Sequence, residues 1–431
     1  MKSLSKVISF ACMLFVGQSA YAVLEIEITQ GIEGALPIAI VAFAGDVYTA
    51  PEVVENIVRD DLQRSGFFDV LGKQRFPQIV TDSSQLNYKV WRDAGVESLL
   101  LGKVTKAGAG QYRVEFQLFD LIRQKRLLGH VVPATIKDVR KVGHKISDLV
   151  FEKLTGIRGA FSTRIAYVST INKNTANQKY VLQIADADGH NARTVFSSKK
   201  QLLSPSWSPD GTRLAYVSFE SGNSAVYVQD IIQGTRSRIS GRAGINSAPA
   251  WSPDGRYLAL TLSVGGSPDI YIMDMGARDI KRLTSATSID TEACWMPDSK
   301  SLLFTSDRSG GPQIYRVSVN GGKPKRLTFE GEYNAAADIS PDGRYLTLVN
   351  NSGHGFRIAV MDMQNQAMRV ISNGSLDEGP SYAPNGSMII YATAEQGRGV
   401  LAAVSADGRV KQKIRLTEGD VREPTWSPFR F

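Results

Sequence analysis

Short apolar segments alternate with polar turn sequences at a nearly constant period in the second half of the chain. The repeated unit, called the anchor below, is a bulky residue followed by Ser-Pro-Asp-Gly or a close variant. Anchors begin at positions 207, 251, 295, 339, 382 and 426. Six residues after each of the first five anchors comes an apolar strand pattern. A period of about 40 to 50 residues is typical of a β-propeller with one four-stranded blade per repeat. We therefore predict a six-bladed β-propeller.

The last repeat is incomplete, and an isolated strand pattern further upstream matches its missing part. After Trp426 the apolar strand would begin at position 432, beyond Phe431. Residues 164–168 have the pattern of such a strand but no anchor before them. We predict that they pair with the last anchor and close the ring, which removes two open sheet edges. The propeller would then cover residues 159–431.

Residues 23–158 do not repeat and show mixed periodicity. Residues 23–29 alternate between apolar and polar positions, which predicts a strand. Residues 51–65 have the spacing of an amphipathic helix that ends at Gly66. This order of elements predicts a small mixed α/β domain. The other expected elements are a buried strand at 36–43, a short helix at 88–94, strands at 98–105, 112–119 and 126–132, a helix at 139–154 and a linker at 155–163.

The first 22 residues have the pattern of a secretory signal peptide. Lys2 and Lys6 precede an apolar run at 7–16, and Ala20-Tyr-Ala22 forms a cleavage motif. The run is too short to span a bilayer as a permanent helix. We expect an exported mature protein that begins at Val23, in which Cys294 is the single cysteine. A lone cysteine beside an anchor Trp is expected to be packed core.

The formal net charge of +8 does not indicate a nucleic-acid partner. Many Lys and Arg residues fall in the predicted outermost strands, such as Lys281-Arg282 and Lys325-Arg326. They are distributed around a ring, whereas nucleic-acid binding needs a basic patch on one face. Charged outer edges discourage pairing between sheets of different molecules. We expect no nucleic-acid partner.

No catalytic or metal-binding motif is present in the sequence. The four histidines are scattered over both domains without ligand spacing, and no Gly-x-Ser-x-Gly motif occurs. Asp186-Ala-Asp188-Gly189 lacks the remaining acidic ligands of a calcium loop, so a hairpin turn is the simpler interpretation. We expect no catalytic residue, cofactor or metal ligand, while a cation held by channel carboxylates stays an open alternative. The histidines are His130, His144, His190 and His354.

Residues just before each anchor vary while the scaffold repeats. Their register places them in the loops that enter the innermost strands, around one mouth of the central channel. Recognition commonly lies in variable loops on a rigid scaffold, although solvated loops without a function are the simpler alternative. The acidic residues of this set would make the mouth acidic; they are Asp290, Glu292, Asp338, Asp377, Glu378, Asp420 and Glu423.

The linker sequence Phe151-Glu-Lys-Leu-Thr-Gly-Ile-Arg-Gly-Ala-Phe-Ser-Thr-Arg-Ile-Ala-Tyr-Val, followed by six such repeats, resembles the TolB family of the Tol–Pal cell-envelope system. The likeness covers the whole chain. It implies a periplasmic, monomeric, non-catalytic adaptor that supports outer-membrane integrity and envelope constriction at cell division. The implied partners are the peptidoglycan-associated lipoprotein Pal at the channel mouth and the inner-membrane protein TolA at the mature N-terminal segment. Other outer-membrane lipoproteins are a further partner class, and contact with membranes would be through partners only.

The resemblance also implies site residues by position. The flexible partner-binding segment would be 23–34, with TolA contacted by Val23, Leu24, Glu25, Ile26, Glu27 and Ile28. The Pal surface would include Asn246, Ser247, Ala248, Thr291, Glu292, Asp338, Glu378 and Glu423. Two residues depart from the expected pattern, because Ile245 replaces a polar residue and Ala293 replaces a proline.

The alternation within 23–29 independently allows this segment to add as a strand to an exposed sheet edge, here or on a partner. Chain ends have low local stability and are easily released. We therefore expect a tail that is either docked on its own protein or paired with TolA. The alternatives are a secreted glycan-binding propeller and a propeller hydrolase. The first would need aromatic side chains at the mouth, and the second would need histidines and carboxylates that converge at the channel.

Overall fold

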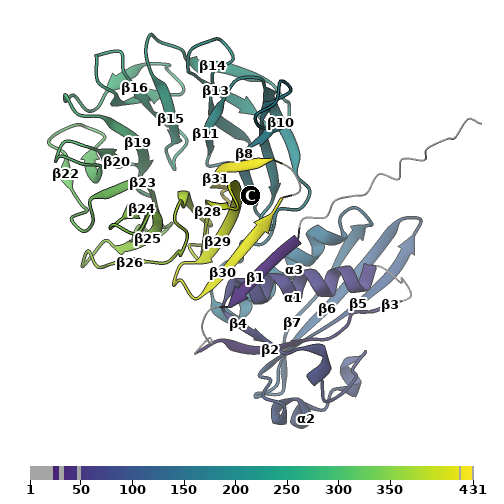
Figure 1. Cartoon of the computed structure of the whole chain (residues 1–431). Coiled ribbons are helices and arrows are strands. Elements are labelled where there is room, and N and C mark those ends of the chain that lie inside the picture. The colour runs from purple at the N-terminus through teal and green to yellow at the C-terminus, as the bar shows by residue number, and fades with distance from the viewer. Residues whose placement is uncertain (1–22, 29–33, 46–49, 417–418, 430–431) are drawn as a thin grey trace, which may run out of the picture.

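The computed structural model of the chain describes residues 23–28, 34–45, 50–416 and 419–429 (Figure 1). The predicted signal peptide at 1–22 and residues 29–33 of the predicted partner-binding segment lie outside the described residues. The chain forms a small mixed α/β domain followed by a six-bladed β-propeller. The fold class predicted from the repeat and from the mixed periodicity is confirmed.

The α/β domain is built on a six-stranded sheet. β2 (Leu36–Ile40) pairs in parallel with β4 (Phe68–Val70) and with β5 (Ser98–Gly108). β5, β6 (Gln111–Asp120) and β7 (Lys125–Thr135) form an antiparallel meander. The short β3 (Ala44–Gly45) pairs in parallel with β5. The periodicity did not predict β3 and β4, since two or three residues are too few to show a period.

Two long helices cover one face of this sheet, and one short helix covers the other. α1 (Ala50–Ser65) and α3 (Val139–Thr155) share one core with Ile38, Leu100 and Phe116. α2 (Tyr88–Asp93) packs on the opposite face through the fully buried Trp91. These three helices match the predicted ones. The short 3-10 helices η1 (Lys73–Arg75) and η2 (Ser83–Gln85) were not predicted.

Each blade of the propeller is a four-stranded antiparallel sheet. The first three blades are β31 (Asp420–Trp426), β8 (Arg164–Ile171), β9 (Lys179–Asp186) and β10 (Arg193–Ser198); β11 (Leu202–Trp207), β12 (Arg213–Ser218), β13 (Ala225–Asp230) and β14 (Arg236–Ser240); and β15 (Asn246–Trp251), β16 (Tyr257–Leu262), β17 (Asp269–Asp274) and β18 (Ile280–Arg282). The next three are β19 (Asp290–Trp295), β20 (Ser301–Ser306), β21 (Gln313–Ser318) and β22 (Lys325–Arg326); β23 (Tyr333–Ile339), β24 (Tyr345–Asn351), β25 (Arg357–Asp362) and β26 (Met368–Val370); and β27 (Glu378–Tyr382), β28 (Met388–Glu395), β29 (Arg398–Ser405) and β30 (Val410–Arg415).

The ring closes through the pairing that the anchor spacing predicts. β31, which ends at the last anchor, pairs antiparallel with β8, and Trp426 lies opposite Ile165. The indole Nε1 of Trp426 donates a hydrogen bond to Thr163 Oγ1 at 2.8 Å, which fixes the closing strand to the start of the propeller. The first blade is thus assembled from both ends of the propeller sequence.

The anchors also connect neighbouring blades. Trp207 Nε1 donates to the carbonyl of Thr425 in the preceding blade at 3.3 Å, and Trp295 Nε1 donates to the carbonyl of Ala250 at 3.0 Å. The indoles of Trp207 and Trp295 therefore bury a large apolar surface and satisfy their one polar group across a blade boundary, whereas Trp251 Nε1 is buried without a hydrogen-bond partner among the described residues. The sequence did not predict these hydrogen bonds.

The α/β domain contacts the end of the first and sixth blades at which the Pro-Asp-Gly turns lie. Asn385 Nδ2, in the turn after β27, donates to the carbonyl of Arg158 at 3.0 Å. Just after α1, a Cβ added to Gly66 would lie 2.8 Å from a methyl of Val410 in β30, so the Gly66 backbone packs closely against the Val410 side chain. The opposite end of the propeller, where the innermost strands begin, is not covered by this domain.

Candidate binding site at the channel mouth

The sequence suggested that the residues preceding each anchor lie in loops. In the structure they instead form the innermost strand of each blade. In every one of these strands the pairing register shifts by a β-bulge. Such bulges redirect side chains and are common near binding sites. The residue three before each anchor has a left-handed backbone, with φ between 44° and 59°; the six are Ser204, Ala248, Glu292, Ala336, Gly379 and Glu423.

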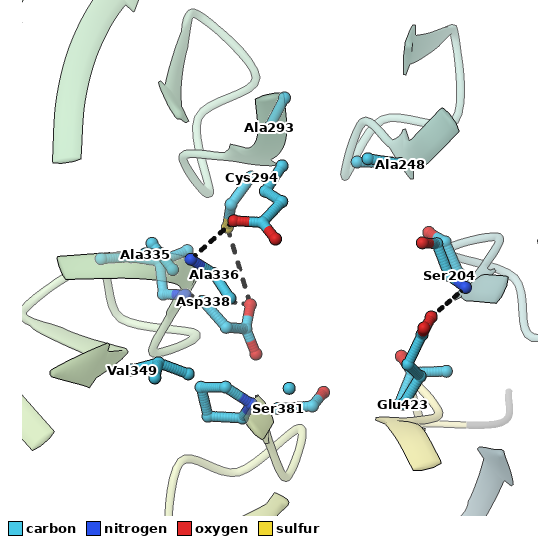
Figure 2. A pocket seen from close by; sticks show the side chains of 18 of the residues that line it. Ser204, Ala248, Ala293, Cys294, Ala335, Ala336, Asp338, Val349, Ser381 and Glu423 are labelled. Atoms are coloured by element: carbon cyan, nitrogen blue, oxygen red, sulfur yellow. Dashed lines mark hydrogen bonds between the residues drawn. The ribbon is translucent and has the colours of Figure 1, made fainter. Parts of the chain in front are cut away.

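These six residues surround a cavity of about 890 Å³ at the end of the channel away from the α/β domain (Figure 2). A left-handed conformation is unfavourable for residues other than glycine, Asn or Asp, so its repetition around the ring marks a constrained surface. Figure 2 shows four of them, Ser204, Ala248, Ala336 and Glu423, around the open centre on different strands. The bulge, not a loop, therefore positions the side chains at the mouth.

Two of the glutamates link one blade to the next. Glu292 Oε2 accepts hydrogen bonds from the backbone N–H of Ala336 and from Thr305 Oγ1, both at 2.9 Å. Glu423 accepts one from the backbone N–H of Ser204, as Figure 2 shows. Each carboxylate thus satisfies the bulged N–H of the following blade. A carboxylate at this position both shapes the mouth and lines it.

The environments of Glu378 and Glu423 disfavour the ionised form of their carboxyl groups. Burial raises the pKa of Glu423 to about 7; the hydrogen bond from Ser204 opposes this rise, and the nearby Glu378 and Glu292 increase it. Burial also raises the pKa of Glu378, against the opposing effect of Arg422, whose guanidinium lies 3.5 Å from its carboxylate. The mouth therefore holds acidic groups with little positive charge beside them.

The expected acidic mouth is smaller than the sequence suggested. Asp290 and Asp420 are buried and do not line the cavity, and Asp377 lines it but is buried as well. The two carboxylate oxygens of Asp290 accept from Arg308 Nη2 at 2.7 and 2.8 Å, and Asp377 accepts from Ser372 Oγ. Asp420 accepts from the backbone N–H of Gly399 and pairs with Lys173. Sequence position alone could not separate these paired carboxylates from free ones.

Asp338 lines the cavity, but its carboxylate already accepts hydrogen bonds from the protein. It accepts hydrogen bonds from the backbone N–H of Tyr382 at 2.7 Å and of Ile339 at 3.0 Å, and the thiol of Cys294 lies 3.6 Å away as a donor. Burial raises the pKa of Asp338 in spite of the two backbone hydrogen bonds. Burial also raises the pKa of the Cys294 thiol well above its usual value. A thiol of this kind is not a nucleophile, which agrees with the expectation of packed core.

Five of the eight residues expected to contact Pal line the cavity: Ala248, Glu292, Asp338, Glu378 and Glu423. Asn246, Ser247 and Thr291 do not. The side chain of Asn246 is fully buried, accepts hydrogen bonds from Ser240 Oγ and the N–H of Arg242, and donates to the carbonyl of Arg242. Asn246 therefore holds its loop and cannot contact a partner through its side chain.

Apolar side chains that sequence reasoning missed are exposed around this mouth. Leu376 lines the cavity itself, and Ile245 lies beside the loop of Val264, since its N–H donates to Ser263 Oγ at 2.7 Å. These exposed apolar residues all belong to loops at the end of the blades where the innermost strands begin. The spacing of the repeats could have predicted that position. We call this group the apolar rim; it comprises Ile245, Val264, Ile289, Phe329 and Leu376.

The expected tail strand docks on the propeller. β1 (Val23–Ile28) pairs antiparallel with β30 and adds a fifth strand to the sixth blade, with Val23 opposite Arg415 and Ile28 opposite Val410 (Figure 1). This edge lies next to the α/β domain. The expectation that the segment can add to a sheet edge of its own protein is confirmed.

Comparison with known proteins agrees with this architecture. Residues 24–127 match the family model described as TolB amino-terminal domain, and residues 151–430 match the one described as TolB beta propeller domain. The chain belongs to the TolB family. The Tol-Pal system protein TolB of Thioalkalivibrio sulfidiphilus is 62% identical over 431 residues, which covers 99% of this chain and 98% of that protein. The protein of the same description from Xanthomonas oryzae pv. oryzae is 52% identical over 412 residues, with coverage of 94% and 93%.

A solved structure supports the same assignment. The crystal structure of TolB from Acinetobacter baumannii is 41% identical and superposes with a TM-score of 0.87, covering 95% of this chain and all of that chain. The resemblance stated from the linker and the repeats is confirmed. As for membrane contact, none of the helices in the described part of the chain has the length and apolar character needed to cross a bilayer.

Proposed function

We propose that this TolB-family protein is a non-catalytic periplasmic adaptor of the Tol–Pal system, which binds Pal at the channel mouth and TolA through the N-terminal tail. Family membership supports a role within that system. The two sites are separate, because the mouth and the α/β domain lie at opposite ends of the propeller. An adaptor of this design can hold two partners without competition for one surface.

The single observation that carries the proposal is the form of the mouth. A cavity of about 890 Å³ with three glutamates near its centre is surrounded by the exposed apolar rim. Exposed apolar groups around a polar centre are typical of protein–protein contact surfaces. Of the residues first expected to contact Pal, we retain Ala248, Glu292, Glu378 and Glu423 as contacts at the cavity and Ser247 and Thr291 at its border, while Asn246 and Asp338 support the site.

The tail supports the second half of the proposal. β1 contributes only one edge strand, and an edge strand can be exchanged for a strand of another protein. Release of Val23–Ile28 would expose a segment with alternating apolar positions. Pairing with β30 in the docked state and with TolA in the released state would use the same backbone groups, so the two states exclude each other.

The chemistry at the mouth does not favour a hydrolase. Cys294 is held as a donor to Asp338, and His144 and His190 lie in the junction between the domains. Among the described residues, the mouth also offers no open aromatic platform for a glycan. Of the four aromatic residues that line the cavity, Trp251 and Trp295 are buried, and the rings of Tyr333 and Phe356 pack edge to face with centroids 5.0 Å apart. A partner protein remains the best match.

Deletion of residues 23–34 tests the assignment of the two sites. The deleted protein should lose TolA binding and keep its affinity for Pal, measured by isothermal titration calorimetry with each purified partner. Peptidoglycan fragments serve as the control ligand and should give no heat. Loss of Pal binding together with TolA binding would show that the sites are not separate, and binding of the fragments alone would favour the glycan-binding alternative.

A further inference from the structure

A cluster of charged side chains lies in the junction between the α/β domain and the first blade, far from the mouth. Sequence reasoning regarded the histidines as scattered, but the fold brings His144 and His190 together. His144 and Arg140 come from α3, Asp61 and Arg64 from α1, and Asp188 and His190 from the turn between β9 and β10. Asp61, Arg64, His144 and Asp188 are each less than a tenth exposed.

His144 lies between one carboxylate from each domain. Its Nδ1 is 2.7 Å from Asp61 Oδ2 within the α/β domain, and its Nε2 is 3.4 Å from Asp188 Oδ2 of the propeller. Arg64 pairs with the other oxygen of Asp61 at 2.8 Å. Nε2 has no hydrogen-bond partner within the described residues, although it is buried. A proton on each imidazole nitrogen would let both carboxylates be held at once.

Arg140 contributes a second cation to the propeller carboxylate. Its guanidinium contacts Asp188 Oδ2 and lies 2.9 Å from His190 Nδ1, while the N–H of His190 donates to Asp188 Oδ1 at 3.1 Å. His144, Asp186 and Asp188 bring three potential metal-ligand atoms within 4.8 Å of one another. However, the Arg140 charge already occupies Asp188, which disfavours a divalent cation at that point.

The charge balance favours a protonated His144. Burial by itself lowers the pKa of His144, but Asp61 and then Asp188 outweigh that effect, and the resulting pKa lies above the usual value. Burial alone would raise the pKa of Asp188, yet the His190 hydrogen bond and the positive charges of His144, Arg64 and Arg140 hold it well below its usual range. The other titratable groups that face the cluster are Asp60 of α1, Asp148 of α3 and Asp186 of β9.

We propose that the protonated imidazole of His144 fastens the α/β domain to the first blade, and that the junction loosens when His144 loses this proton. A histidine whose pKa is raised in the folded protein contributes stability that is fully present below its unfolded value, about 6.5. That contribution is lost as the pH rises through the folded value. The fastening is therefore strongest in acid and weakens on the alkaline side of neutral.

The junction bears on more than the two domains. α1, which carries Asp61 and Arg64, ends at Gly66 against Val410 of β30, the strand on which β1 docks. A looser junction would remove this support from the edge that holds the tail. The proposal stands apart from the partner assignments, since it needs neither Pal nor TolA for its test.

Thermal unfolding of the purified protein and of two variants tests the proposal. His144→Gln keeps a polar side chain but cannot carry the charge, and His354→Gln is the matched control at an exposed histidine outside the junction. We expect His144→Gln to melt several degrees below the wild type at pH 6. By pH 9 the difference in melting temperature between His144→Gln and the wild type should be less than a third of its value at pH 6. His354→Gln should melt at the wild-type temperature at every pH. Equal melting at every pH, or a gap that does not change with pH, would overturn the proposal.

A second measurement applies even if His144→Gln does not fold. The imidazole resonances of the wild type and of Asp188→Asn are followed by NMR as the pH changes. Removal of the propeller carboxylate should lower the titration midpoint of His144 by about one pH unit or more, and an unchanged midpoint would overturn the proposal.

In a parallel experiment, Zn²⁺ or a chelator is added to the wild type and to His144→Gln. Stabilisation by Zn²⁺ that His144→Gln abolishes would reveal a metal site and also overturn the proposal.

Discussion

The channel mouth and the domain junction both place carboxylates in poorly solvated surroundings, but they treat the charge in opposite ways. At the junction, Arg140 and His144 lie beside Asp188, and the pKa of that carboxyl falls well below its usual range. At the mouth, Glu423 has carboxylates rather than cations as its charged neighbours, and its pKa rises to about 7. The same chemical group is stabilised as an anion at one end of the propeller and destabilised at the other.

This difference separates the domain junction from the mouth, which we propose as a binding surface. A buried charge that is paired and hydrogen-bonded holds two parts of a protein in one geometry, whereas an unpaired one costs stability. Natural proteins retain such a cost where function needs the group. The mouth glutamates, which open onto a cavity, are therefore the groups that a partner can satisfy, and the junction carboxylates are not.

The largest expected effect comes from removing the carboxylate that pairs with two cations at the domain junction. Asp188→Ala leaves His144 and Arg140 without their shared carboxylate, and we expect a loss of about 3 kcal/mol in the free energy of unfolding. Urea unfolding at pH 6 measures it. Asp186→Ala, at the end of β9 just before this turn, should cost less than about 1 kcal/mol because the hydrogen bond described for its carboxylate is to the exposed Asn191 side chain. Equal losses in the two variants would contradict the role of Asp188.

A smaller effect of opposite sign is expected at the mouth. Glu423→Gln keeps an acceptor for the N–H of Ser204 but removes the charge. Because the folded pKa of about 7 lies above the unfolded one, wild-type stability is fully present below about pH 4.3 and declines as the pH rises through 7. The variant should match the wild type at pH 4 and exceed it by on the order of 1–2 kcal/mol at pH 8. Thermal unfolding across this range checks the result, and a variant less stable at pH 8 would refute it.

The smallest effect is expected where a pair is exposed. Lys89 and Asp93 form an ion pair of 2.6 Å on α2, with side chains 75% and 62% exposed. Lys89→Ala should change the free energy of unfolding by about 0.3–0.5 kcal/mol, a difference that disappears in high salt. A loss as large as that of Asp188→Ala would mean that burial does not separate the two kinds of pair.

The fold could be predicted because its causes are local and repeated. The Pro-Asp-Gly turn, the anchor side chain and the apolar strand recur with one period, so six copies of the pattern confirm one another. The same count predicts that the strand at 164–168 pairs with the last anchor, and the structure pairs it with β31. Helices α1 and α3 were visible through their apolar stripes.

The site was predicted only in part, because its details are set by long-range contacts. The β-bulge three residues before each anchor is marked in the sequence only by Gly379 and by a proline that follows it in four of the six repeats, and Glu292 adopts the same conformation with neither. Asp290 and Glu292 look alike in sequence, yet one is buried against Arg308 and the other lines the cavity. The domain junction brings together groups that are far apart in the sequence, such as Asp61 and Asp188, which are 127 residues apart. Motif spacing cannot predict a contact over that separation.

Calorimetric titration of Pal into three forms of the protein tests the account most directly. The forms are the wild type, Glu378→Lys at the mouth and Asp188→Asn at the domain junction. Glu378 is suited to this because its carboxylate accepts no backbone hydrogen bond among those described, unlike that of Glu292 or Glu423. We predict that Glu378→Lys weakens Pal binding at least about tenfold, or about 1.4 kcal/mol, without a change in melting temperature. Asp188→Asn should melt lower and bind Pal as the wild type does. The account would be contradicted if Glu378→Lys bound Pal with unaltered affinity, or if only Asp188→Asn lost affinity for Pal.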